Sequence, residues 1–215
     1  NAGFALTGAG SEDPASFPTS SSEEGMVGKC VKLVTKGTGD FGEKLDMPIA
    51  AGNLFMGTFN MGNALTDPLK ATKFGVPFEF VPTYLKGYYK YKAGEVYKDE
   101  KGNEVKNKKD TWDIYAIFYE TDENTKTLDA TDRFDHPNLI SIARIEEKDR
   151  KETDEWTEFY LPFVTKPGKS VDKEKLKAGK YNVAIVFSSS IEGDYFRGAV
   201  GSTLYVDEVE LIHAA

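Results

Sequence analysis

The chain has 215 residues and a net charge of −8 at pH 7, which argues against a nucleic-acid phosphate footprint. It has no run of 18 apolar residues that could span a membrane, and its single cysteine excludes an intrachain disulfide. Size scaling buries about 70% of the unfolded surface. An aromatic content of 13%, with 20 glycines and 9 prolines, favours a β-sandwich over helices. Because no initiator Met or signal peptide is present, we expect a processed piece of a longer protein.

The predicted elements are short strands separated by turn residues. Residues 8–25 are rich in Ser, Gly, Pro and acids and predict a loop. A charged hairpin tip is predicted at 98–105, solvated connections at 120–134 and 146–155, and a helix only over 170–177, capped by Ser170. No linker divides the chain, so we expect one domain over residues 1–215. Strands are predicted near 26–35, 50–60, 74–81, 84–92, 112–120, 139–145, 156–164, 181–188 and 203–212.

The strand at 112–120 is apolar on both of its alternating faces. A strand covered on both sides belongs at the middle of a sandwich, with a second layer over the face that does not hold Trp112. Asp113 and Tyr115 lie on that second face. A buried carboxylate needs partners, and either a ligand hydroxyl or a structural hydrogen bond would serve.

The closing hairpin, residues 181–212, is the most informative segment. An apolar strand ends at Ser188–Ser190, and a Gly- and Asp-containing loop with Asp194 follows. The last strand changes phase between Val206 and Val209, which predicts a β-bulge at Asp207–Glu208. Bulges and polar strand ends re-aim side chains, so this hairpin is the first place to look for a site.

A tyrosine cluster at 84–91 alternates with lysines. Strand parity puts Lys86 and Tyr88 on one face and Tyr89 and Tyr91 on the other. Aromatic platforms next to polar groups are typical of sugar-binding sites. The alternative is that Tyr89 and Tyr91 fill the core while the lysines face solvent.

Other chemistries have weaker support. No Gly-x-Ser-x-Gly motif occurs, and one cysteine with two distant histidines gives no zinc site. We expect Cys30 to be a buried core residue. Calcium held through Asp207 and backbone carbonyls is an alternative. A glycosidase pair could be drawn from the acids beside apolar strands, which are Asp113, Glu79, Asp194 and Glu208.

Several segments together resemble the putative carbohydrate metabolism domain family of gut Gram-negative bacteria, over essentially the whole chain. The resemblance is carried by residues 1–7, 49–55, 74–78, 85–94, 113–116 and 188–211, and the pattern Gly-Ser-x-Leu-x-Val-Asp-Glu-Val-Glu-Leu is its most specific part. It implies a jelly roll akin to carbohydrate-binding modules and some glycoside hydrolases. It also implies export to the periplasm or cell surface and an upstream immunoglobulin-like domain. The family's domain normally begins before the Asn-x-Gly-Phe element, so we expect a first strand to be missing.

We therefore predict an all-β jelly roll with at most one short helix that binds a glycan or oligosaccharide in a concave hollow. No cofactor other than the calcium ion is expected. The alternatives are a glycoside hydrolase with a buried carboxylate pair and a structural cell-surface module without a ligand. Replacing Tyr88 or Asp113 by alanine is predicted to abolish binding with little change in melting temperature. The predicted contacts are Lys86, Tyr88, Asp113, Tyr115, Ser188, Ser190, Asp194 and Asn53.

Overall fold

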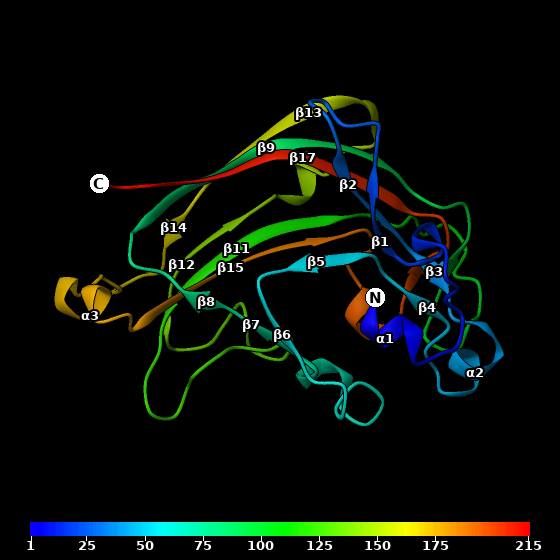
Figure 1. Cartoon of the computed structure of the whole chain (residues 1–215), viewed down its shortest axis with the longest axis horizontal. Helices are drawn as coiled ribbons and strands as arrows, with labels where there is room; N and C mark the ends of the chain where they lie inside the picture. The colour runs from blue at the N-terminus through cyan, green and yellow to red at the C-terminus, as the bar shows by residue number, and fades with distance from the viewer.

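Two antiparallel sheets pack against each other (Figure 1). The computed structural model describes residues 1–215 apart from the side chain of Ala2. The first sheet has the order β1-β2-β17-β9-β13, with bounds Thr19–Ser22, Cys30–Val34, Thr203–His213, Pro82–Lys92 and Thr153–Pro162. The second has the order β14-β12-β11-β15-β5, and β8 also pairs with β15. Its bounds are Val164–Thr165, Leu139–Arg144, Asp113–Glu120, Tyr181–Ser188, Asn53–Phe55 and, for β8, Val76–Pro77.

Smaller elements close the ends of the sandwich. Three two-stranded ribbons pair β3 with β4, β6 with β7 and β10 with β16. Their bounds are Lys36–Gly37, Ile49–Ala50, Gly57–Phe59, Thr72–Phe74, Tyr97–Lys98 and Gly198–Ala199. The α-helices are α1 (Ala2–Ala5), α2 (Gly39–Lys44) and α3 (Lys173–Lys177), and the 3-10 turns are η1 (Pro14–Ser16), η2 (Pro68–Lys70), η3 (Glu147–Asp149) and η4 (Gly193–Tyr195). No described helix has the length and apolar character needed to cross a membrane.

The main core lies between the two sheets. Trp112 is fully buried and its ring centroid lies 4.2 Å from that of Tyr89. Leu85, Phe159 and Leu204 belong to the same cluster. Tyr89 and Tyr91 thus fill the core, as the alternative interpretation of the tyrosine cluster expected. The all-β sandwich of the jelly-roll class is confirmed.

The central strand β11 is buried on both faces, as predicted. Seven of its eight residues are buried. A second core forms on the face away from the first sheet, where Tyr115, Ile117 and Tyr119 pack against Phe74 and Leu128. These last two residues come from β7 and from the connection after β11, which lie beside this sheet in Figure 1. The second layer is therefore made of irregular segments and a short ribbon rather than of a third sheet.

The predicted β-bulge is confirmed. The register between β17 and β9 shifts between Asp207 and Glu210, and Glu208 has a φ of 52°. The extra residue brings Leu211, opposite Leu85, to the same side of the sheet as Leu204 and Val206, whereas Val209 in the bulge is exposed. Cys30 is also buried, as expected, with 5% of its surface exposed.

Some local predictions were wrong. Residues 19–22, expected in a loop, form β1, and α1 and α2 bring the number of short helices to three. Helix α3 is capped by Asp172, whose carboxylate accepts hydrogen bonds from the amides of Glu174 and Lys175, and not by Ser170. The strand expected at 74–81 is broken at Gly75, where φ is 132°. Pairing with β2 accounts for β1, whereas the cap of α3 is a local contact of Asp172.

Candidate functional site

The pairing register brings three of the predicted residues into one row. Asp113 on β11 is opposite Ser188 on β15, and Ser188 is opposite Asn53 on β5. The next row on the same face holds Tyr115, Val186 and Phe55, because side chains two residues apart share a face. This part of the sheet therefore presents a polar row beside an aromatic row.

A cavity of about 300 Å³ lies over these two rows. Its size is at the lower end of the range for small-molecule sites, roughly 300–1,000 Å³. Asn53, Asp113, Tyr115, Ser188, Ser190 and Asp194 all line it. Its other walls come from the N-terminal segment, from β4, from residues 59–74 and from two loops, and include Phe4, Ile49, Phe59, Phe74 and Arg133.

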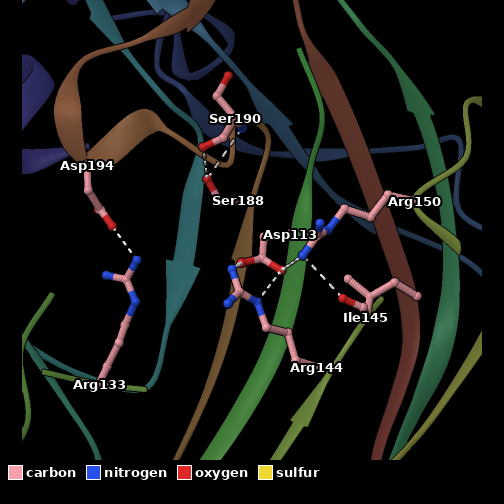
Figure 2. A network of polar contacts seen from close by, with 8 residues as sticks. All are labelled: Asp113, Arg133, Arg144, Ile145, Arg150, Ser188, Ser190 and Asp194. Atoms are coloured by element: carbon pink, nitrogen blue, oxygen red, sulfur yellow. Dashed lines mark hydrogen bonds and ion pairs between the residues drawn. The ribbon is translucent and has the colours of Figure 1, made fainter. Parts of the chain in front are cut away.

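Asp113 is held by two arginines (Figure 2). Arg144 donates from Nη2 to Oδ2 at 2.8 Å and from Nε to Oδ1 at 3.3 Å, and Arg150 Nη2 lies 3.5 Å from Oδ1. The side chain of Asp113 is only 5% exposed. A carboxylate this deeply buried is stable only because its charge is compensated. The structural hydrogen bond that the sequence left as an alternative is therefore present.

A second ion pair lies across the cavity. Arg133 Nη2 is 2.7 Å from Asp194 Oδ2, and Figure 2 shows this pair apart from the Asp113 group. The Arg133 guanidinium lies 4.9–5.6 Å from the ring centroids of Phe74, Tyr115 and Phe134, within the range of cation–π contacts. Burial lowers the pKa of Arg133, but the charge and hydrogen bond of Asp194, together with Tyr115 and Asp113, outweigh this effect and the net shift of the pKa is upward. The group stays charged.

Tyr115 lies between these two ion pairs. It is 3% exposed, and burial raises the pKa of its phenol, against the opposing charge of Arg133. No hydrogen bond joins its hydroxyl to the described residues of the chain. Tyr115 therefore offers the cavity a neutral hydroxyl that can donate to a ligand.

The two serines of the site have different environments. Ser188 Oγ donates to the carbonyl of Ser190 at 2.9 Å. Ser190 is 1% exposed, and its hydroxyl donates to Asp110 at 2.6 Å and lies 2.5 Å from Thr35 Oγ1. Ser190 thus lines the cavity wall, but its hydroxyl is committed to a structural network. Contact between Ser190 and a ligand stays a prediction.

Lys86 and Tyr88 are not part of this site. Both lie on β9 in the other sheet, where Lys86 Nζ is 3.2 Å from Glu210 and Tyr88 Oη is 3.2 Å from Glu158. The prediction that they face the same hollow as Asp113 is wrong. Strand parity placed them correctly on an outward face, but parity does not tell which sheet a strand joins.

Because Tyr88 contacts only a surface partner, we now expect Tyr88→Ala to leave binding in the cavity unchanged. The free energy of unfolding should change by less than about 0.5 kcal/mol, as is usual for surface sites. Titration calorimetry with any glycan that the wild-type protein binds, together with urea unfolding, measures both quantities. A loss of affinity in a folded variant would contradict this placement.

The remaining candidate acids lie elsewhere. Neither Glu79 nor Glu208 lines the cavity. Asp207 accepts hydrogen bonds from the amides of Val27 and Glu208 at 3.1 Å and 2.8 Å. Among the described residues no three His, Cys, Asp or Glu side chains gather as metal ligands do. Calcium at Asp207 stays a prediction.

Sequence reasoning missed the arginines. Arg133 and Arg150 belong to the charged connections that were expected to be solvated, yet their side chains are only 12% and 11% exposed. A signal was present in the composition. Only 4 of the 27 basic residues are arginines, and three of these four form the ion pairs described here. Since arginine is favoured over lysine for buried pairing with carboxylates, its rare use could have pointed to this site.

Comparison with known proteins gives one family and two close structures. A family model described as "Putative carbohydrate metabolism domain" matches residues 1–212. A crystal structure of a putative glycoside hydrolase from Bacteroides thetaiotaomicron is 60% identical with a TM-score of 0.97, over 100% of this chain and 62% of that one. Another from Bacteroides vulgatus is 47% identical with a TM-score of 0.93, over 99% and 83%. The chain thus spans less than two thirds of the first of these two structures.

More distant likeness is weak. A family 16 carbohydrate-binding module aligns over 92% of this chain and 86% of its own at 15% identity, with a TM-score of 0.39. No protein of curated function matches the chain. Of the structures described here, the two from Bacteroides are near enough to support inference.

Proposed function

The chain belongs to the putative carbohydrate metabolism domain family, and on that premise we propose that it binds a glycan in the cavity over β11 and β15. The observation that carries the proposal is the composition of the cavity wall. An aromatic row of Tyr115 and Phe55 lies beside a polar row of Asp113, Ser188 and Asn53. Sugars present apolar C–H faces together with many hydroxyls, so a wall of this kind suits them.

A glycan array followed by titration calorimetry tests this proposal. We expect binding of at least one oligosaccharide, and weaker binding of that oligosaccharide when cavity residues are altered. Absence of binding to neutral and acidic glycans of plant, animal and bacterial origin would contradict it and favour a structural module.

Tyr115→Phe is expected to weaken glycan binding about 3–10-fold, because one hydrogen bond contributes roughly 0.5–1.5 kcal/mol. The melting temperature should stay the same, since the hydroxyl has no partner within the described chain. Calorimetry and thermal unfolding measure the two effects, with Tyr88→Phe as the matched control on the other sheet. Unchanged affinity for Tyr115→Phe would remove Tyr115 from the contacts.

Hydrolysis is the second candidate, because Asp113 and Asp194 line one cavity. A glycosidase needs one carboxyl group to hold a proton before reaction. Both of these carboxylates already accept hydrogen bonds from arginines, so neither is free to donate a proton to a glycosidic oxygen. We therefore place binding first. Release of reducing sugar from a bound oligosaccharide, lost in Asp194→Asn, would reverse that order.

Family membership also supports a proposal about the location of the protein. We infer export to the periplasm or cell surface and an upstream immunoglobulin-like domain in the full-length protein. Fractionation of cells that express the full-length protein tests the location directly.

A further inference from the structure

The buried side-chain atoms that lack a hydrogen bond in the described structure belong to two of the arginines that pair with Asp113 and Asp194. Among the described residues, the buried side-chain nitrogens and oxygens without a hydrogen bond are Nε and Nη1 of Arg133 and Nε of Arg150. Buried polar groups are nearly always paired, and an exception needs an explanation. Arg133 lines the cavity beside Asp194 and Tyr115, whereas Arg150 holds Asp113 and is not part of the cavity wall, so the unused donors of Arg133 belong to the candidate binding site.

The charges of the site are also unbalanced. Its ion pairs join three guanidinium groups, of Arg133, Arg144 and Arg150, to the two carboxylates of Asp113 and Asp194. One positive charge is left over, in a chain whose net charge is −8. The Tyr115 hydroxyl adds another donor without an intrachain partner. Of the three arginines, Arg133 is the one that lines the cavity, so its two unused nitrogens and the Tyr115 hydroxyl are the unpartnered donors nearest to a ligand.

A ligand can reach this donor-rich wall from the cavity. Arg133 lines the cavity, and its partner Asp194 is 31% exposed on the short turn η4. The rings of Phe74 and Phe134 lie 5.5 Å and 4.9 Å from the Arg133 guanidinium and limit its movement. A planar carboxylate can accept two parallel hydrogen bonds from one guanidinium group. The ammonium group of a lysine cannot donate such a pair.

We propose that the cavity recognises an acidic sugar, a glycan residue that carries a carboxylate, and that Arg133 binds this carboxylate. This inference rests on the proposed glycan-binding function and names its ligand class. The sugar carboxylate lies beside Asp194 and takes hydrogen bonds from Arg133 and Tyr115. It also neutralises the extra positive charge of the site. A neutral sugar leaves both the donors and the charge uncompensated.

Matched pairs of ligands test the proposal. Oligosaccharides of galacturonic, glucuronic and mannuronic acid are titrated as free acids and as methyl esters, together with their neutral parent sugars and a sulfated oligosaccharide. We expect at least one free acid to bind about tenfold or more tightly than its ester. Arg133→Lys, which keeps the charge but not the fork, should remove this preference. Arg197→Lys, which alters an arginine paired with Glu100 outside the cavity, should keep it.

The outcomes distinguish the acidic-sugar proposal from the more general proposal of glycan binding. An ester or neutral sugar that binds as tightly as the acid overturns the acidic-sugar inference and leaves glycan binding intact. A sulfated ligand that binds more tightly than every uronate overturns the assignment of a carboxylate. Failure of every glycan to bind contradicts both proposals. If Arg133→Lys does not fold, Tyr115→Phe gives the second measurement, because its hydroxyl is the other proposed donor to the sugar carboxylate, and an unchanged acid preference there counts against the site.

Discussion

Asp113→Ala is expected to lower the free energy of unfolding by about 3–5 kcal/mol, the usual cost of removing one partner of a buried ion pair. The change leaves Arg144 and Arg150 facing each other with no carboxylate between them. Arg150 suffers most, because its side chain is 11% exposed and its Nη2 would keep only the carbonyl of Ile145, at 3.2 Å. Urea unfolding measures the loss.

This expectation replaces the sequence-based one, in which Asp113→Ala abolished binding and spared the melting temperature. Asp154→Ala, at an exposed position of β13, is the control and should change stability by less than about 0.5 kcal/mol. Asp113→Asn keeps the shape of the side chain and removes only its charge. The decrease in the free energy of unfolding of this variant therefore shows how much of the effect is electrostatic. A loss below about 1 kcal/mol for Asp113→Ala would mean that the arginines find other partners.

Asp110→Ala is expected to cost a similar amount, about 3–5 kcal/mol, for a different reason. One oxygen of Asp110 accepts hydrogen bonds from Ser190 Oγ at 2.6 Å, Ser202 Oγ at 2.7 Å and the amide of Ala199 at 2.9 Å. All of these groups are buried, and each donor left unpaired costs roughly 1–3 kcal/mol. Glu147→Ala, at an exposed position, serves as the control in the same unfolding experiment. Full stability of Asp110→Ala would show that water replaces the carboxylate.

The same residue gives a pH dependence. Burial raises the pKa of Asp110, although hydrogen bonds from Ala199, Ser190, Ser202 and Thr111 act in the opposite direction. A raised pKa means that the folded state holds the proton more tightly than the unfolded state. This contribution to stability is complete below the unfolded pKa, about 3.9, and is lost as the pH rises through the folded value. The stability of the wild-type protein relative to Asp110→Asn should therefore fall as the pH rises above about 4. A relative stability that increases over that range would show that the hydrogen bonds dominate.

Much of the sheet structure follows from the sequence because strands carry a period of two. The double-sided burial of β11, the bulge after Asp207 and the core positions of Tyr89 and Tyr91 could all be predicted from alternation. The row of Asp113 and Ser188 also follows once β11 and β15 are paired antiparallel. These features depend on neighbours within one strand or on a single pairing.

The rest depends on which strands share a sheet and on how loops fold back. Alternation placed Lys86 and Tyr88 on an outward face of β9, but that face belongs to the other layer. Arg133 and Arg150 lie in connections whose composition is that of solvated loops, and they are buried only because tertiary packing brings them to Asp194 and Asp113. Long-range ion pairs of this kind leave no local pattern in the sequence.

The burial of β11 on both faces has a consequence for recognition. Asp113 and Tyr115 are mounted on the most enclosed strand of the molecule, and two arginines and packed rings restrict the movement of their side chains. A ligand therefore meets groups that are already close to their bound arrangement, so association loses little conformational entropy. Selectivity then depends on rigid complementarity of shape and charge, and ligands of the wrong shape are rejected rather than accommodated.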